Sequence, residues 1–536
     1  MSCSFNHEAS AEMKPISRRL NRRRFLQAAA STGVVGAWVQ RPAFGDQLTP
    51  SRLRGLDDYV EKAMARWEVP GLAIAVVQEG KLVHARGYGV RSVGEDARVD
   101  AETVFPIASC TKSFTAAAIA KLIDNGKVRW DDPISKHLPA FQLSDPELTA
   151  KVTIRQALGH RTGLPTANML WRSGGFDGNE IVARLRRLKP VAAPGEKFIY
   201  NNNLYLVLGQ LVEQVSGQTW DDFLHNELFV PLGMKSTSAE SSGIQDRENV
   251  AAPHASDAGK LQRISRYCPD VVAPGGAIHS NVLDMAQWLK LHLDGGVSDG
   301  RRIISKVRLE EMHTAPQPAE KRDPADTRDP RVSMENYGLG WFFNDQGGRQ
   351  VVEHSGHSNG FVSWVAMIPE ERLGLVVLSN QHNTGLNLAL RIWILDALLG
   401  RPQRDWSEKV RTGFDKILER FRDAKAKYAA NRPLETALPR PLSEFAGRYT
   451  SPLYGDVVIT EKDGRLNLQF GTRFEGEMQH WEKESFRAFF PNPRLDDWLV
   501  TFAIQEGRVT GLRVKESPWA PPDYNDADDL GEFHRG

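Results

Sequence analysis

Ser109 and Lys112 are the first residues whose types and spacing indicate chemistry. Residues three apart share one face of a helix, so the hydroxyl and the amine would lie close together at the start of an Ala-rich helix. A serine nucleophile needs a base within hydrogen-bond reach, and lysine can be that base if burial lowers its pKa. The same spacing also fits a helix-capping serine followed by a solvated lysine, but the apolar neighbours Phe105, Ile107 and Phe114 argue against a solvated face.

A second motif, Tyr200-Asn201-Asn202-Asn203, follows at a predicted loop before a helix. The Tyr200 phenol is suited to relay protons, and an amide two residues on can hydrogen-bond the carbonyl of a substrate amide. The three asparagines are also typical of turns and helix caps, so this alternative remains open on the sequence alone.

The third motif is Glu353-His354-Ser355-Gly356-His357, at the start of an apolar segment that we expect to be a strand. A His-x-Gly sequence can line a site opposite the nucleophile. Gly356 would allow a close approach of the backbone, and the N–H group that follows it could complete an oxyanion hole with the helix start. The alternative without a functional role is an ordinary glycine-containing turn with solvated histidines.

Taken together, the chain resembles the serine β-lactamase and penicillin-binding-protein superfamily, in its class C β-lactamase-like branch. The resemblance spans roughly residues 50–400 and implies that Ser109 is the acyl-forming nucleophile, Lys112 its base and Tyr200 a proton relay. It further implies that Asn202 holds the substrate amide, that His354, Ser355, Gly356 and His357 line the strand side, and that the N–H groups of Ser109 and His357 form the oxyanion hole. It implies no cofactor and no metal. Further blocks carry the resemblance: Val69-Pro70-Gly71-Leu72, Gly80-Lys81, Gly87-Tyr88-Gly89, Leu158 to Leu164, Pro194-Gly195, Phe229 to Met234, Gly275-Gly276 and Tyr337 to Trp341.

One departure bears on the substrate. Class C β-lactamases carry Lys-Thr-Gly at the third motif, where this chain has His354-Ser355-Gly356. A fixed cation grips a substrate carboxylate, whereas histidine is only partly charged near neutral pH. We therefore expect an esterase, D-aminopeptidase or D,D-peptidase more than a β-lactamase. The alternative is a penicillin-binding sensor or degenerate hydrolase without efficient turnover.

Two rival sites were considered. Gly356 to Gly360 matches the Gly-x-Ser-x-Gly nucleophile elbow, with Ser358 as nucleophile, but an elbow leads into a helix and the segment that follows looks like a strand. His354-x-x-His357 is compatible with a zinc site, yet no further His or acidic element with metal-ligand spacing accompanies it.

The elements that would position these motifs predict an α+β fold. An antiparallel sheet would be built from both ends of the domain, with a helical part between its strands and the nucleophile helix where they meet. Alternating runs beyond residue 441 predict a small antiparallel β domain, either a sandwich or a barrel. We expect an export signal at residues 1–45, the hydrolase domain at 46–400, a partly helical linker at 401–440 and the β domain at 441–536. The linker helix would run from Trp406 to Ala430.

Composition limits the partners. With 68 Lys plus Arg and 67 Asp plus Glu, the net charge of +1 gives no reason to expect nucleic acid. Three cysteines make a disulfide scaffold unexpected, and no apolar run reaches the roughly 18–20 residues of a membrane span. The basic segment Asn21 to Gln27, followed by a mildly apolar Ala/Gly-rich stretch, resembles a twin-arginine export signal and predicts a periplasmic or secreted protein. The partner would be a small-molecule or peptide acyl substrate; the oligomeric state is open.

Overall fold

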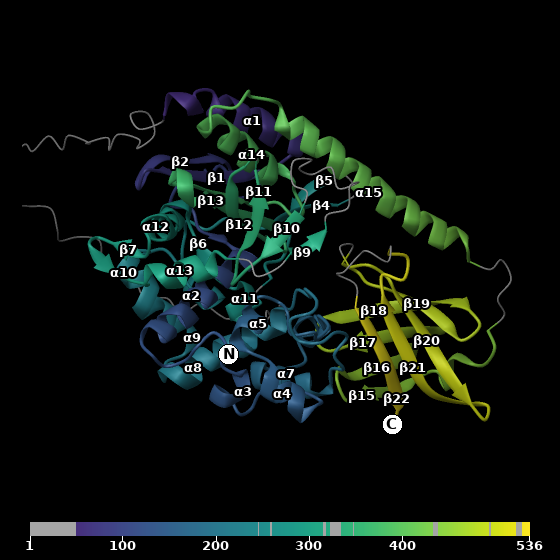
Figure 1. Ribbon diagram of the computed structural model, residues 1–536. Coiled ribbons are helices and arrows are strands. Elements are labelled where there is room, and N and C mark those ends of the chain that lie inside the picture. The colour runs from purple at the N-terminus through teal and green to yellow at the C-terminus, as the bar shows by residue number, and fades with distance from the viewer. Residues whose placement is uncertain are drawn as a thin grey trace, which may run out of the picture. The chain divides into compact units, whose positions relative to one another are not determined.

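The computed structural model describes residues 50–536 except 245, 258–259, 268, 315–317, 322–333, 347, 433–437, 493–494 and 521–527. The described residues belong to one compact unit (Figure 1). The predicted export signal at residues 1–45 lies outside the described residues.

The hydrolase part is built on one antiparallel sheet of eight described strands. Strand β1, close to the start of this part, pairs with both β2 and β14, so the sheet joins segments about 300 residues apart, as expected from the sequence. In spatial order the strands are β2 (Lys81–Gly89), β1 (Gly71–Gln78), β14 (Leu373–Ser379), β13 (Phe361–Ile368), β12 (Gln350–Ser358), β11 (Phe342–Asp345), β10 (Met334–Tyr337) and β9 (Pro318–Lys321).

Helices cover both faces of this sheet, which explains why β1 is apolar at almost every position. On one face Leu72, Ile74 and Val76 join the core that is formed with α1 (Leu56–Trp67) and α14 (Leu386–Leu398). On the other face Ala73, Ala75 and Val77 join a larger core. Strand periodicity thus divides one continuous apolar run between two cores.

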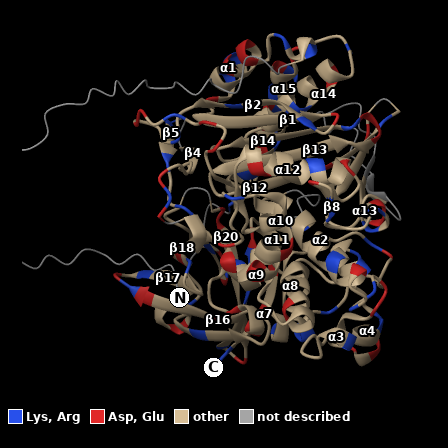
Figure 2. Ribbon diagram, turned by 90° about the vertical axis from the view of Figure 1, so that its left-hand side faces the viewer, with Lys and Arg blue, Asp and Glu red and all other residues tan. Residues whose placement is uncertain are grey.

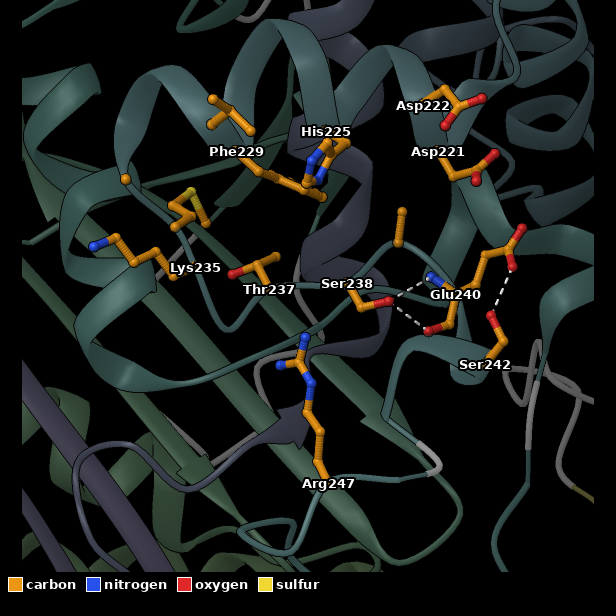
Figure 3. A pocket seen from close by; sticks show the side chains of 14 residues that line it. Asp221, Asp222, His225, Phe229, Lys235, Thr237, Ser238, Glu240, Ser242 and Arg247 are labelled. Atoms are coloured by element: carbon orange, nitrogen blue, oxygen red, sulfur yellow. Dashed lines mark hydrogen bonds between the residues drawn. The ribbon is translucent and has the colours of Figure 1, made fainter.

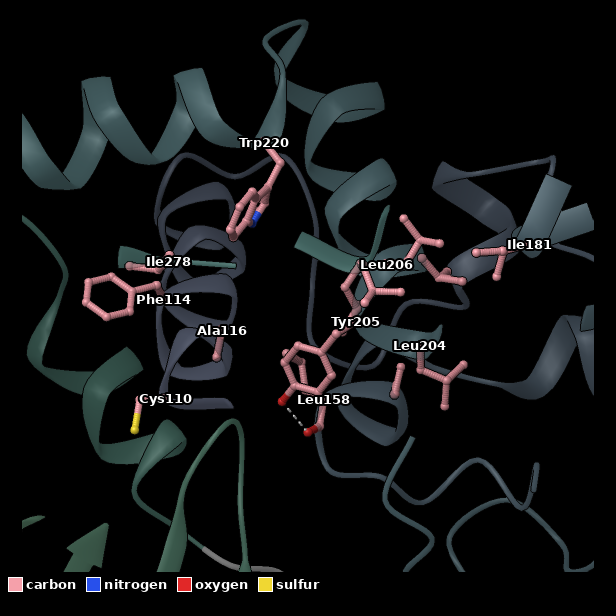
Figure 4. Close-up of a cluster of buried hydrophobic side chains, with 14 of the residues drawn as sticks. Cys110, Phe114, Ala116, Leu158, Ile181, Leu204, Tyr205, Leu206, Trp220 and Ile278 are labelled. Carbon is pink, nitrogen blue, oxygen red and sulfur yellow. Dashed lines mark hydrogen bonds between the residues drawn. The ribbon is translucent and has the colours of Figure 1, made fainter. Parts of the chain in front are cut away.

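The larger core contains the helices that carry the first two motifs. In Figure 4, Cys110, Phe114 and Ala116 lie on one side of this core and Tyr205 on the other, where its hydroxyl donates to the Leu158 carbonyl over 2.8 Å. The helices between the strand groups are α2 (Thr111–Asp124), α3 (Ile134–His137), α4 (Pro146–Lys151), α5 (Ile154–Leu158), α6 (Met169–Arg172), α7 (Gly178–Arg184), α8 (Asn202–Ser216), α9 (Trp220–Leu224), α10 (Val230–Leu232), α11 (Ala273–Gly276), α12 (Val282–Leu293) and α13 (Lys306–Met312).

Three two-stranded pairings supplement the main sheet. They join β3 (Phe105–Pro106) with β6 (His279–Ser280), β4 (His254–Asp257) with β5 (Lys260–Arg263), and β7 (Val297–Ser298) with β8 (Arg301–Arg302). The β3–β6 pairing ties the segment just before Ser109 to the segment just after α11.

The C-terminal part is a closed antiparallel barrel of eight strands, which resolves the choice between sandwich and barrel. Helix α15 (Trp406–Ala430), expected over the same residues, precedes it. The barrel strands are β15 (Gly447–Ser451), β16 (Gly455–Lys462), β17 (Arg465–Phe470), β18 (Phe474–Glu482), β19 (Ser485–Phe489), β20 (Trp498–Gln505), β21 (Arg508–Glu516) and β22 (Asp529–Arg535).

Barrel residues bond the segment around α6 of the hydrolase part. The buried Asp528 carboxylate accepts hydrogen bonds from the Met169 backbone N–H at 2.8 Å and from the Thr166 hydroxyl at 3.2 Å. Arg172 forms an ion pair with Glu516 at 2.9 Å. The segment from Thr166 to Arg172, which follows α5, is therefore bonded to the barrel.

Charged residues of both signs are interspersed along the elements in Figure 2, in keeping with the balance of the composition. Among the described residues, the search for a helix long and apolar enough to cross a membrane found none.

Candidate active site

The predicted nucleophile, Ser109, lies in a short 3-10 turn, Ala108–Cys110, immediately before α2. Ala108 has a φ of +45°, a left-handed conformation that is costly for a residue with a Cβ atom. Strained backbone of this kind persists where its surroundings hold it, and it is concentrated at functional sites. Ser109 itself is half-buried.

The Lys112 amine has three hydrogen-bond partners, one of which is Ser109. Its Nζ is 2.7 Å from the Gly275 carbonyl oxygen, 2.7 Å from Asn202 Oδ1 and 3.2 Å from Ser109 Oγ. The Gly275 carbonyl can only accept, and the Asn202 oxygen likewise, so two N–H groups of the amine are committed to them. In a neutral amine the remaining lone pair is then available to the Ser109 hydroxyl, which is the arrangement that a general base needs.

Lys112 is fully buried, and this burial lowers the pKa of its amine to about 7. The rings of Tyr200 and Tyr205 lie 4.7 Å and 5.2 Å from Nζ, measured to the ring centroids. These rings replace water around the amine while still attracting its cationic form. An amine with a pKa near neutrality is deprotonated in a substantial fraction of molecules at physiological pH.

The second motif separates into residues with different tasks. Asn201 caps α8 by accepting from the Leu204 N–H, and Asn203 donates to the carbonyls of residues 166 and 167. Only Asn202 faces Lys112, and because its oxygen is used there, its NH2 group is the part left for a substrate carbonyl. The capping alternative thus applies to Asn201, while Tyr200 and Asn202 are half-buried beside Lys112.

The third motif occupies the second half of β12 rather than the start of a strand. Strand β11 pairs with β12 only as far as Glu353, and from His354 onward the described pairings of β12 are with β13. Where the pairing with β11 ends, the turn Ala108–Cys110 packs against β12 instead, and the Cys110 thiol lies 3.2 Å from the His354 carbonyl. The first and third motifs are thereby brought together.

Gly356 is required for this close approach. A Cβ atom at this position would lie 2.2 Å from the Ile107 carbonyl oxygen, 2.3 Å from Ser363 Oγ and 3.0 Å from the Ser109 nitrogen. The Ser109 N–H, one half of the predicted oxyanion hole, therefore lies next to the strand segment that carries the His357 N–H. The sequence suggested that Gly356 lets the backbone approach the substrate. The structure shows that it also lets β12 pack against the turn that carries Ser109.

His354 is buried and has a partner on each ring nitrogen. Nδ1 lies 2.6 Å from the Ser355 carbonyl, which can only accept, so Nδ1 carries the hydrogen. Nε2 lies 3.2 Å from the Tyr337 hydroxyl and accepts from it. Burial, followed by the nearby charge of Lys112, lowers the pKa of His354 to about 3. The imidazole is therefore neutral and provides no cation for a substrate carboxylate. Ser355 is half-buried and His357 is exposed.

The rival sites find no support in this geometry. Ser358 is the last residue of β12, and β13 follows it after a two-residue turn, so no helix stands where an elbow needs one. Among the described residues, no three His, Cys, Asp or Glu side chains are grouped so that they could hold a metal ion. The Cys110 thiol is buried, and burial raises its pKa to about 12, so it remains protonated.

Several contacts of the site were not identified as functional from the sequence. The Gly275 carbonyl holds Lys112, and the Ser363 hydroxyl donates to the Ile107 carbonyl at 2.6 Å, which ties β13 to the nucleophile turn. Tyr337 holds His354. Gly275 and Tyr337 belong to blocks that carry the family resemblance, so the signal was present, but nothing in their types or spacing indicated these contacts.

The cavity drawn in Figure 3 is separate from these residues. It has a volume of about 560 Å³ and is lined by residues between Asp221 and Arg247, with both acidic and basic side chains. None of the predicted catalytic residues lines it. Its mixed charges indicate no particular ligand, and we base no function on it.

The comparisons with known proteins identify the family and the fold. The model of the family described as Beta-lactamase matches residues 56–399, and the model of a domain of unknown function, DUF3471, matches residues 431–531. The unguisins hydrolase ungD of Aspergillus violaceofuscus is 28% identical over 472 residues, covering 80% of this chain and 81% of that protein. Protein flp of Staphylococcus aureus is 26% identical over 343 residues, covering 63% and 65%.

Solved structures show the same fold. The octameric penicillin-binding protein homologue from Pyrococcus abyssi matches with a TM-score of 0.58 at 24% identity, covering 90% of this chain and all of that one. SurE matches with a TM-score of 0.54 at 19% identity, covering 90% and 99%. At these identities the similarity concerns the fold. Because each match covers 90% of this chain, it extends into the C-terminal barrel.

Proposed function

The chain belongs to the beta-lactamase family, and we propose that it is a serine hydrolase that forms an acyl-enzyme on Ser109 with ester or amide substrates. The observation that carries this proposal is the buried Lys112 amine, 3.2 Å from Ser109 Oγ and with its pKa lowered to about 7. A buried lysine placed in this way is suited to take the serine proton at neutral pH.

In the proposed first step, Ser109 Oγ attacks the substrate carbonyl carbon while its proton moves to Lys112. The carbonyl oxygen becomes an oxyanion stabilised by the N–H groups of Ser109 and His357. When the intermediate collapses, the bond to the leaving group breaks, and that group takes the proton from Lys112 by way of Tyr200. Water then attacks the acyl-enzyme, gives its proton to the Tyr200–Lys112 pair, and Ser109 departs with a proton.

The strand side of the site supports a restriction on the substrate. A carboxylate next to the reacting bond needs a cation, and the imidazole of His354 is neutral, with both nitrogens already hydrogen-bonded. We therefore propose that the preferred substrates, such as neutral esters or the amides of D-aminopeptidase type, carry no carboxylate at that place. β-Lactams and D,D-peptides, which carry one, would be poorer substrates.

The names of similar proteins are compatible with hydrolysis. The relative that matches over four-fifths of this chain is named a hydrolase of unguisins. We propose hydrolysis for this chain on the strength of its own Ser109–Lys112 geometry, with the relative's name as secondary support.

Covalent labelling tests the proposal. The mature protein and its Ser109→Ala variant are each incubated with a fluorophosphonate probe and with a penicillin, and intact mass is measured over time. We expect a fluorophosphonate adduct on Ser109 that is absent from the variant. Labelling by the penicillin should be slow or absent, because the neutral imidazole of His354 offers its carboxylate no charge.

A penicillin adduct that forms rapidly and persists would instead support the penicillin-binding sensor, and rapid turnover of the penicillin would support a β-lactamase. Ser109→Cys is a useful companion variant, because it keeps a nucleophile of similar size at the same place. If neither reagent labels Ser109 in folded protein, the proposed nucleophile is wrong.

We also propose that residues 1–45 direct export by the twin-arginine route. The basis is the basic segment Asn21 to Gln27 and the weakly apolar stretch after it. Expression of the full chain in a bacterial host should give a periplasmic or secreted protein whose N-terminus, read by mass spectrometry, lies near Asp46. Replacing Arg23 and Arg24 together by lysine should leave the precursor in the cytoplasm.

A further inference from the structure

His160 lies outside the three motifs, in the turn that follows α5, and it is fully buried. Its φ of +57° is left-handed, a conformation that histidine and asparagine adopt more readily than most residues with a Cβ atom. Burial deprives the polar imidazole of its hydration, so contacts with the protein have to compensate for it.

Those contacts converge on Tyr200. The Ile199 N–H donates to the His160 carbonyl oxygen at 2.8 Å, and the Asn201 N–H donates to His160 Nδ1 at 3.0 Å. One residue thus holds the backbone on both sides of Tyr200. The imidazole also lies against the Tyr200 phenol, with the ring centroids 4.2 Å apart.

The bond to Asn201 requires an unprotonated Nδ1, because a nitrogen that accepts a backbone N–H cannot also carry hydrogen. Burial first, and then the charges of Lys112 and His354, hold the pKa of His160 well below its usual value, so the ring is neutral. The Asn201 N–H then selects the tautomer with its hydrogen on Nε2. The titratable groups that face the ring are Lys112, Tyr200, Tyr205, Tyr337 and His354.

We propose that His160 is a positioning residue for Tyr200, whose Nδ1 and carbonyl oxygen fix residues 199–201 so that the phenol stays beside the Lys112 amine. The inference rests on the proposed function, since it concerns the proton relay of that reaction. Tyr200 stands on a loop with no strand or helix of its own, and Asn202 begins α8 only two residues later. The Asn201 side chain also donates to the Pro165 carbonyl at 2.7 Å, but His160 bonds the main chain on each side of Tyr200, where the reaction needs a fixed phenol.

Three variants separate the acceptor from the ring. In His160→Asn, Oδ1 occupies the place of Nδ1, because both atoms are bonded to Cγ, and asparagine also tolerates the left-handed backbone. His160→Phe keeps an aromatic ring against Tyr200 but removes the acceptor. His160→Gln removes the acceptor at that place with a flexible polar side chain, and it replaces the phenylalanine variant if that variant does not fold.

The measurements are kcat and KM for a neutral p-nitrophenyl ester, normalised to the fraction of Ser109 that a fluorophosphonate labels at saturation. We expect His160→Phe to lower kcat by roughly 10- to 100-fold with KM changed by less than about threefold. His160→Asn should remain within about threefold of the wild type in both. A purely structural role would reduce the labelled fraction or the melting temperature and leave kcat per labelled site unchanged.

The Tyr200→Phe background tests whether His160 acts through the phenol hydroxyl. In that background His160→Phe should have little further effect on kcat, because the group that it positions is gone. Full activity of His160→Phe, equal losses in His160→Asn and His160→Phe, or additive losses in the double variant would each overturn the inference. Failure of the wild type to label at Ser109 would overturn the proposed function instead, so the two outcomes are distinguishable.

Discussion

The two sides of the active site each contain a buried nitrogen base, and burial has opposite consequences for them. On α2, burial lowers the pKa of Lys112 from 10.5 to about 7. On β12, burial lowers the pKa of His354 from 6.5 to about 3. Desolvation disfavours the charged form of both groups. Because the ordinary pKa of lysine is much higher than that of histidine, the lowered pKa of Lys112 lies near neutral pH, where the amine can gain and lose a proton. The lowered pKa of His354 lies below the physiological range, so the imidazole stays neutral.

The hydrogen-bond partners of the two groups fit these different states. The Lys112 amine is surrounded by oxygen atoms of Gly275, Asn202 and Ser109, all of which can accept from an ammonium group. When the amine is neutral, the hydrogen bond with Ser109 can reverse, because the hydroxyl can donate to the nitrogen lone pair. His354 has one partner that accepts and one that donates, which only a neutral imidazole satisfies. The same physical effect thus produces a proposed base on one side and an uncharged structural group on the other.

Lys112→Met provides the largest expected effect. The substitution keeps the length and apolar stem of the side chain but removes the nitrogen that we propose takes the Ser109 proton. We expect kcat/KM for a neutral ester to fall by roughly 10²- to 10⁴-fold, the usual contribution of a general base. Steady-state kinetics measure this, with near-ultraviolet circular dichroism as the check on folding. Turnover above a tenth of the wild-type value in the folded variant would contradict the proposed role.

The same variant tests the burial cost of the amine. Since the pKa of Lys112 is lower in the folded state than in the unfolded chain, the unfolded state binds more protons between pH 7 and 10.5, and wild-type stability should rise with pH across that window. Relative to Lys112→Met, the wild type should gain on the order of 3 kcal/mol in free energy of unfolding from pH 7 to 10.

Urea unfolding of both proteins at pH 7, 8.5 and 10 gives this difference directly. The comparison with the variant removes the contributions of the titrating groups that Lys112 does not influence. A difference in unfolding free energy that does not change with pH would mean that the amine is not desolvated in the way that its burial indicates.

The pH dependence of the reaction sharpens the comparison of the two bases. With an uncharged ester, kcat/KM should fall tenfold for each pH unit below the pKa of Lys112, giving a loss of about 100-fold at pH 5. His354, with a pKa of about 3, should add no second acidic limb between pH 5 and 8. A profile measured from pH 5 to 9 with the labelled fraction of Ser109 as the enzyme concentration checks this; a limb of slope two would contradict it.

Much of the fold and the chemistry-bearing residues could be predicted from the sequence, because their signals are local. Ser109 and Lys112 are three residues apart where a 3-10 turn leads into α2, and Tyr200 and Asn202 are two residues apart where a loop leads into α8. The antiparallel sheet and its helices were predicted from periodicity and are confirmed. The alternating runs beyond residue 441 predicted an antiparallel β domain, which the closed barrel confirms. The alternation is weaker in β18 (Phe474–Glu482), where Gly476 takes an inward position and the pairing register shifts between His480 and Glu482.

The remainder depends on contacts between distant segments, which local patterns do not contain. The Gly275 carbonyl that holds Lys112 is a backbone atom 163 residues away, and any residue type has one. That His354 is neutral follows from its burial and from Tyr337, neither of which the Glu353 to His357 sequence reveals. The sequence therefore indicated which residues could react, but not which of them would be charged.

The smallest expected effect is that of His354→Gln, and it decides whether the comparison is correct. Glutamine can offer an acceptor to the Tyr337 hydroxyl near the place of Nε2, and it carries no charge, as we argue for the histidine. We expect kcat/KM for a neutral ester to remain within about tenfold of the wild type, with the acidic limb still near pH 7, since only hydrogen-bond geometry is altered. The profile from pH 5 to 9, measured beside that of Lys112→Met, is the test. If His354→Gln lost as much activity as Lys112→Met, or lost the acidic limb, the imidazole would have to titrate in the reaction. Burial would then not have removed it from the chemistry, and the substrate preference inferred from its neutrality would fail with it.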